Sequence, residues 1–380
     1  MKIRVSLYRI SGTFYAFLLL TLVSIQDVWA QEKLRKNFEN VQIDGQRVYY
    51  EQRLYRNPFI GLYEIKKSVR DSADVLTYIP LIQGIPVSKI HLGKSLEMSS
   101  LLPEEQKRYY AKLRFPLQRN NYKFDFWLQP VFTAIFGNFT KPVESNTSLL
   151  LQSQVYLWPG MVLNWGILFP IVNDLDGRPK IIRPAPLFLN QFYASGNHFV
   201  SASAGFFMND QYGINVQYRH TDLSKPWSYG LEAGYTGFYY YPRGGIYFED
   251  LKQLLLLADV AYRFPTHDVT LKLSGGQFLW QDKGVRFDFI RQFTNVEVGL
   301  YITKTQNGST AGFNFAVPIP PGKIAQGQHV RLRTTDEFRW EYTYTRGYKI
   351  GERYRLGYQL DQRLRQYHRN YLNRQYLESK

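Results

Sequence analysis

Apolar and polar side chains alternate with a period of two residues from about residue 112 to the last part of the chain. The segments 214–219, 229–236 and 269–274 each alternate in this way. Successive side chains of a β-strand point to opposite faces, so each segment has one apolar face and one polar face. Turn residues, such as those at 282–284 and 307–308, separate the segments. The pattern predicts about twelve to fourteen antiparallel strands.

The first part of the chain has a different pattern. Asp44-Gly45 stands between two apolar runs and predicts a β-hairpin. The segments 76–82 and 87–92 are further strand candidates, whereas 63–74 lacks strand alternation and is expected to form a short helix. Residues 31–115 are therefore expected to form a small periplasmic α/β domain.

The N-terminus has the organisation of a secretory signal. Lys2, Arg4 and Arg9 precede the apolar run 12–25, and Val28-Trp29-Ala30 resembles a cleavage site. The alternative is a transmembrane anchor, but the run is shorter than the roughly 20 residues that a spanning helix needs. We expect residues 1–30 to be a cleaved signal peptide and the chain to be exported.

Composition favours strands with one face in lipid. Aromatic residues make up 17% of the chain, although the mean hydropathy is only −0.34. In a bilayer the backbone groups of strands are all satisfied only in a closed barrel. The predicted fold is all-β: an antiparallel transmembrane β-barrel over residues 116–360, in the outer membrane of a Gram-negative cell. The alternative is a secreted soluble β-sandwich or propeller, although no blade-length repeat is visible.

The formal net charge of +16 indicates anionic partners. Export argues against nucleic acid, which leaves outer-membrane lipid, lipopolysaccharide and acidic polysaccharide as partners. The alternative is that the charge serves solubility alone. The chain has no cysteine, which excludes disulfides, thiolate metal sites and a lipid-modified N-terminal cysteine.

Residues 361–380 form a basic C-terminal tail, with five basic and two acidic residues. Its apolar residues fall at helical spacing, and four arginines are candidates for polyanion contact: Arg363, Arg365, Arg369 and Arg374. The alternative is a frayed, solvated extension. In either case we expect the barrel to assemble without this tail.

Enzyme signatures are weak. A Ser–His pair could only be assembled from Ser201 or Ser203 with His198 or His220, and no Gly-x-Ser-x-Gly motif is present. The six histidines are scattered. We expect a chain that is not an enzyme, with no catalytic, cofactor or metal site.

Two groups of acidic residues have non-catalytic interpretations. The segment 173–177 resembles part of a calcium loop but lacks the full series of ligands, which favours a polar turn. Glu232, Glu297 and Glu341 are expected to face the lumen among arginines.

Residues 349–356 have the spacing of the C-terminal strand signal that the barrel-assembly machinery reads. Its four positions are Lys349, Gly351, Tyr354 and Leu356. The interpretation requires a strand here, with Tyr354 and Leu356 facing lipid.

The segments 286–293, 296–301, 311–320 and 335–340 resemble the later strands of the YjbH-like family of exopolysaccharide-associated outer-membrane β-barrel proteins. The resemblance implies a non-enzymatic role in exopolysaccharide production or export, with the barrel-assembly machinery and other secretion proteins as partners. The alternatives are a general porin or small-solute channel, and an outer-membrane hydrolase of lipid or glycan.

Overall fold

A computed structural model of the chain describes residues 37–69, 77–112, 124–136, 143–175, 179–208, 210–242, 245–327, 329–343, 349–353 and 359–380. The expected signal peptide, residues 1–30, lies outside the described residues. No helix in the described ranges is both long enough and apolar enough to span a membrane.

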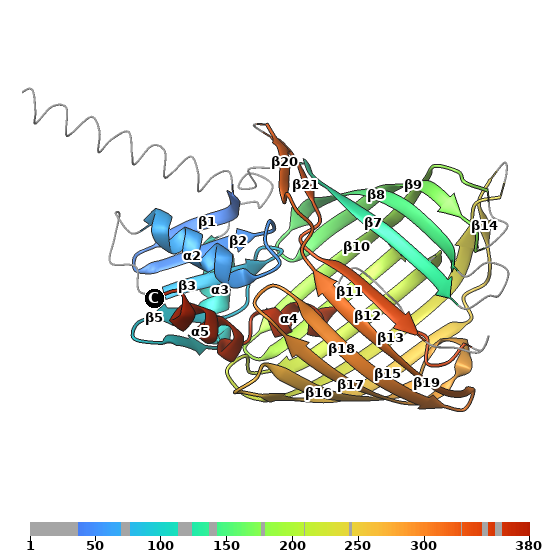
Figure 1. The fold of residues 1–380 in the computed structure, drawn as a ribbon. Coiled ribbons are helices and arrows are strands. Elements are labelled where there is room, and N and C mark those ends of the chain that lie inside the picture. The colour runs from blue at the N-terminus through green and yellow to red at the C-terminus, as the bar shows by residue number, and fades with distance from the viewer. Residues whose placement is uncertain are drawn as a thin grey trace, which may run out of the picture.

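A six-stranded sheet forms near the N-terminus (Figure 1). Its strands are β1 (Phe38–Asp44), β2 (Arg47–Gln52), β3 (Thr77–Ile82), β4 (Ile85–Pro86), β5 (Lys89–Leu92) and β6 (Leu96–Ser99). The predicted hairpin is confirmed, because Asp44 pairs with Arg47 and Gly45 adopts a φ of +56° in the turn.

Two helices accompany this sheet, α2 (Pro58–Val69) and α3 (Pro103–Lys112). Helix α2 begins and ends about five residues before the predicted segment 63–74. The Asn57 side chain accepts a hydrogen bond from the Phe59 backbone at 3.0 Å, and Pro58 occupies the first turn, so a cap and a favourable proline set the start.

The rest of the described chain forms a second, 16-stranded sheet. Its strands are β7 (Phe124–Phe136), β8 (Val143–Trp158), β9 (Met161–Asn173), β10 (Arg183–Ser195), β11 (His198–Phe206), β12 (Gln211–Thr221), β13 (Trp227–Tyr240), β14 (Tyr247–Phe248), β15 (Gln253–Phe264), β16 (Val269–Gln277), β17 (Lys283–Gln292), β18 (Glu297–Thr305), β19 (Gly308–Val317), β20 (Lys323–Gln326), β21 (Val330–Thr334) and β22 (Phe338–Thr343). This is more strands than the twelve to fourteen expected, because short strands such as β14, β20 and β21 lack a clear alternation.

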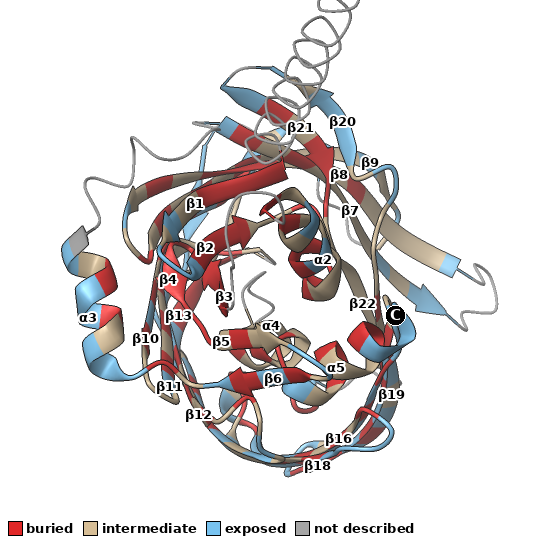
Figure 2. Ribbon diagram, turned by 90° about the vertical axis from the view of Figure 1, so that its left-hand side faces the viewer, coloured by how far each residue is buried: buried red, intermediate tan, exposed pale blue. Residues whose placement is uncertain are grey.

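The large sheet has a polar inner face and an apolar outer face. On β15 and β18, Leu256 and Leu300 point outward and are each 56% exposed. On β12 and β17, Asn215 and Arg286 point inward and are 1% and 3% exposed. Figure 2 shows that the strands follow a curved wall around an interior that contains a helix.

Hydrogen bonds do not close the curved sheet among the described residues. Consecutive strands are paired from β7 to β19, and β22 pairs with β19. Strand β21 pairs in parallel with the start of β7, with Val330–Thr334 alongside Phe124–Leu128. As a result, β22 and the second half of β7 face each other without a ladder of backbone hydrogen bonds. We call this boundary the seam.

The C-terminal residues fold into two helices, α4 (Leu360–Gln366) and α5 (Arg369–Glu378). Helix α4 lies inside the curved wall, where Asp361 accepts a hydrogen bond at 2.7 Å from Lys272 of β16 (Figures 1 and 2). Helix α5 packs beside the six-stranded sheet. The frayed extension considered for residues 361–380 is therefore wrong, because these residues are integrated into the fold.

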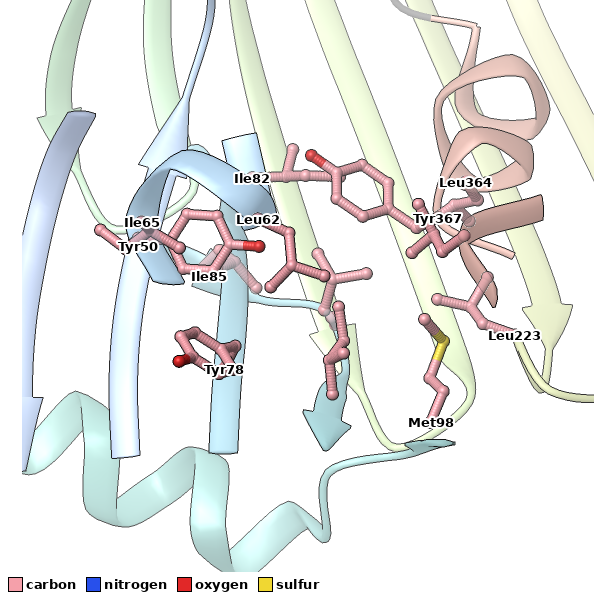
Figure 3. Packing of buried hydrophobic residues seen from close by; sticks show 14 of the residues in the cluster. Tyr50, Leu62, Ile65, Tyr78, Ile82, Ile85, Met98, Leu223, Leu364 and Tyr367 are labelled. Carbon is pink, nitrogen blue, oxygen red and sulfur yellow. The ribbon is translucent and has the colours of Figure 1, made fainter. Parts of the chain in front are cut away.

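One apolar core joins three parts of the chain. It contains Leu62 and Ile65 of α2, Leu364 and Tyr371 of the C-terminal helices, and Leu223 at the end of the large sheet. Figure 3 shows residues of this cluster, among them Leu62, Leu364 and Leu223, gathered between the small sheet and strands of the curved wall. The two sheets and the C-terminal helices are therefore packed together as one body.

Candidate functional site

A cavity lies where the small sheet meets the seam. Its volume is about 310 Å³, near the lower end of the size range of small-molecule sites. Polar and apolar side chains both line it. The polar ones include Glu51, Gln52, Arg53, Gln83, Gln129, Gln152, Gln154, Arg333, Arg339, Glu341, Arg353, Gln362, Arg363 and Gln366.

The cavity lies beside the seam. The Thr335 amide donates to the Leu128 carbonyl at 2.9 Å, and beyond Leu128 strand β7 has no described backbone partner on this side. Two aromatic pairs cover the gap from outside: Phe132 lies 6.1 Å from Trp340 and Phe136 lies 6.0 Å from Tyr342, measured between ring centres. Because Phe132 and Trp340 also line the cavity, the cavity reaches from the lumen to the seam.

Other charged groups neutralise the carboxylates on the cavity wall. Glu337 accepts hydrogen bonds from Arg56 at 2.8 Å and Arg339 at 2.9 Å. Glu341 accepts from both terminal nitrogens of Arg286, at 3.3 and 3.4 Å. Arginines therefore hold both Glu337 and Glu341 in place on the cavity wall.

Glu51 is satisfied by backbone and hydroxyl donors from the small sheet and the curved wall. The amides of Gln83 and Gly84 donate to it at 2.8 and 2.9 Å, and the Tyr156 hydroxyl donates as well. Burial raises the pKa of the Glu51 carboxyl, and the nearby Arg53 charge opposes this rise. Glu51 is thus a structural acceptor where the small sheet meets β8.

Two buried ion-pair networks hold the small sheet against the curved wall. In the first, Asp125 of β7 lies 2.7 Å from Arg331 and 3.1 Å from Arg333, and Arg331 also lies 3.0 Å from Glu39 of β1. Arg53 pairs with Glu39 in the same network. Sequence analysis did not single out these residues, because Glu39 and Asp125 are far apart in the chain and no local motif connects them.

Glu297 is the centre of the second network. Arg339 of β22 lies 2.8 Å from it, Arg365 of α4 lies 3.2 Å from it, and Arg56 of the N-terminal domain lies 3.8 Å from it. Glu297 and Glu341 therefore face arginines, as predicted. Glu232 also lies on the inner side, where Asn215 donates to it at 3.0 Å.

Part of the predicted assembly signal is not a strand. Residues 349–353 have no strand conformation; the Gly351 amide donates to Asp282 at 2.8 Å and Lys349 lies over the ring of Trp280 at 3.3 Å. The expected strand over Lys349 and Gly351 is wrong, because this segment binds the β16–β17 turn instead. Tyr354 and Leu356 lie outside the described residues.

The four tail arginines do not form one exposed surface. Arg365 is paired with Glu297, and Arg374 lies 2.7 Å from Asp268. Arg363 lines the cavity, and Arg369 is exposed. The four arginines predicted to contact a polyanion therefore lie in different surroundings. Among these four, Arg363 is the one that lines the cavity.

The candidate Ser–His pairs are separated by the sheet. Ser201 and Ser203 of β11 point inward, where each accepts a hydrogen bond from Asn190 at 2.9 Å. His198 lies on the same strand, but its side chain points to the opposite face of the sheet from Ser201 and Ser203. It pairs in register with His220. Neither histidine can therefore take a proton from these serines.

The described residues contain no group of three or more His, Asp or Glu side chains placed to hold a metal ion. In the polar segment 173–177, residues 176 and 177 lie outside the described ranges.

Residues 182–320 match a protein-family model described as "YjbH: Exopolysaccharide biosynthesis protein YbjH". This range begins next to β10 and extends past β19. No curated protein and no solved structure matched the chain. The resemblance expected from the sequence is thus confirmed: residues 182–320 are similar to the YjbH family of exopolysaccharide biosynthesis proteins.

Proposed function

We propose that this chain is a non-enzymatic outer-membrane protein that takes part in exopolysaccharide production or export. In this proposal residues 1–30 are a cleaved export signal and the curved sheet is a transmembrane barrel. The small sheet and helix α5 then lie on the periplasmic side. The family match supports the exopolysaccharide role.

The observation that carries the membrane proposal is the inverted polarity of the large sheet. Outward side chains such as Leu231, Leu273 and Ile302 are 55%, 49% and 61% exposed, whereas inward Lys272 and Asp288 are 6% and 3% exposed. In water each exposed apolar side chain would forgo about 1.5–3 kcal/mol of burial. In a bilayer the outer belt is solvated by acyl chains, and the inner face provides a polar lumen.

The structure favours this role over an open porin. Helix α4 lies inside the wall and is fixed there by Asp361–Lys272 and Arg365–Glu297 pairs, and the small sheet covers the same end. A passive pore needs a continuous water path, which these elements obstruct. A regulated role with one or more partner proteins fits this covered lumen better.

The proposal is tested by deleting the chain from its host and restoring it from a plasmid. We expect loss of exopolysaccharide on deletion, recovery on complementation, and fractionation of the protein with the outer membrane in a heat-modifiable form. Recovery of unboiled protein in the soluble periplasmic fraction would contradict the barrel. Unchanged exopolysaccharide output would contradict the role.

A further inference from the structure

We infer that the cavity at the seam is a binding site for a saccharide that carries negative charge. The inference rests on the proposed function, because it names the ligand that the lumen would hold. It is carried by three observations on the cavity wall: unpartnered polar atoms, an arginine without an ion pair, and aromatic rings beside amides.

Two buried polar atoms on the wall have no hydrogen-bond partner among the described residues. They are Oε1 of Gln83, a residue that is 2% exposed, and Nη2 of Arg339. One is an acceptor and the other is a donor. Leaving such groups unpaired is unfavourable, so a ligand that both donates and accepts would stabilise the site. Sugar hydroxyls do both.

The charge of the wall favours an acidic sugar over a neutral one. Arg353 lines the cavity and forms no salt bridge within 4.0 Å with a described residue, and its charge acts on Glu232. Arg363 lines the same cavity, whereas Glu337 and Glu341 are already neutralised by Arg56, Arg339 and Arg286. One carboxylate, Asp336, lies at the rim, 44% exposed and 3.5 Å from Arg333. A carboxylate or phosphate on the ligand would therefore pair with Arg353.

The remaining wall has the chemistry that recognises sugar rings. Gln129, Gln152 and Gln362 supply amides that can donate and accept, and Trp127 and Trp340 supply aromatic surface. Gln52 and Gln83 come from the small sheet, whereas Gln362 comes from α4. The site is therefore complete only when the small sheet and the C-terminal helix are docked.

The experiment uses the mature full-length chain in lipid nanodiscs and isothermal titration calorimetry. The probes are tetragalacturonate, which carries carboxylates, and uncharged maltotetraose. We expect tetragalacturonate to bind the unaltered protein more tightly than maltotetraose. Arg353→Gln should weaken tetragalacturonate binding about tenfold and leave maltotetraose unchanged, because one charge-assisted hydrogen bond is lost.

Arg369→Gln is the matched control, since it removes the same charge from an exposed position outside the cavity. We expect it to bind like the unaltered protein. Equal affinities for both probes, no binding of either, or equal loss in Arg369→Gln would overturn the inference. Any of these results would overturn the saccharide site alone. The proposed function would still hold if deletion of the chain abolishes exopolysaccharide, so failure of the site and failure of the function can be distinguished.

Discussion

At the scale of single residues, Glu297 connects four segments that are far apart in the sequence. It stands at the start of β18 and is fully buried. Its partners Arg56, Arg339 and Arg365 come from the N-terminal domain, β22 and α4. A buried carboxylate between three arginines is stabilising only while all partners are present, because each uncompensated charge bears a large desolvation cost.

Replacing Glu297 with Gln should therefore destabilise the folded protein by about 3–5 kcal/mol. The matched control is Asp336→Asn, which removes a carboxylate that is 44% exposed and lies 3.5 Å from Arg333. Its cost should be at most about 1 kcal/mol. Urea unfolding in detergent micelles, followed by tryptophan fluorescence, measures both. Equal midpoints for the two variants would show that Glu297 is not the centre of the interface.

His368 is a second buried residue with a defined role, since it caps α5. Its Nε2–H donates to the Lys225 carbonyl at 3.0 Å, and its Nδ1 accepts from the Asn370 amide at 3.3 Å. Both bonds together require the neutral ring. Burial, reinforced by the charge of Arg263, lowers the pKa of His368 to about 3.

This shift makes the docking of α5 sensitive to acid. An unfolded histidine titrates near 6.5, so between about pH 6.5 and pH 3 the unfolded segment binds a proton that the folded one does not. The contribution of His368 to the free energy of unfolding is complete above pH 6.5. It falls with the pH, by about 2 kcal/mol at pH 5. Hydrogen exchange of the α5 amides should show this loss of protection.

His368→Asn is the informative variant, because asparagine can cap a helix but does not titrate. It should lower protection of α5 by a similar amount at pH 8 and pH 5. A pH dependence as steep as that of the unaltered protein would assign the effect to another group.

At the scale of elements, the C-terminal helices connect the two sheets. Leu360, Leu364 and Tyr371 are at most 3% exposed and belong to the core that also contains α2 and Leu223. Removal of residues 361–380 would expose the apolar underside of the small sheet, and whether the barrel assembles without them stays a prediction.

Deleting residues 361–380 should therefore release the small sheet from the curved wall and open the lumen. We expect faster trypsin cleavage within residues 37–112 and a larger single-channel conductance in planar bilayers. Truncation of residues 377–380 is the control, because these four residues are exposed. If the protein without residues 361–380 has the same conductance and the same resistance to trypsin as the control, the C-terminal helices do not close this end of the curved wall.

The local pattern predicted some elements well. Alternation identified the strands around 214–219 and 269–274, which lie within β12 and β16, and Asp44-Gly45 identified the first hairpin. These features depend on neighbouring residues, so a reading of the sequence can find them.

The cavity and the end of the chain depend on distant contacts. Gln83 and Gln129 meet at one wall although 45 residues of sequence separate them, and nothing near either residue marks it as part of a site. Residues 349–353 have the composition of a strand, but Asp282 binds the Gly351 amide and β22 already pairs with β19. Tertiary hydrogen bonds therefore overrode the local pattern.

At the scale of the whole molecule, the proposed barrel requires lipid around the curved sheet. The outward side chains of β13 to β19 are mainly Leu, Ile, Phe and Tyr, and the inward ones carry most of the charge. At the seam, the facing edges of β7 and β22 carry backbone amides and carbonyls without ladder partners. Such unpaired groups are energetically costly in lipid. The Phe132–Trp340 and Phe136–Tyr342 pairs shield these edges from the outer side.

The most direct test measures which side chains touch lipid. Because the chain has no cysteine, single cysteines can carry nitroxide spin labels at Leu256, Leu273 and Leu300 on the outer face and at Thr270 and Thr303 on the inner face. In nanodiscs we expect the outer labels to relax with oxygen, which partitions into lipid, and the inner labels with a water-soluble nickel complex. Outer labels that meet the nickel complex as readily as the inner ones would contradict the membrane barrel.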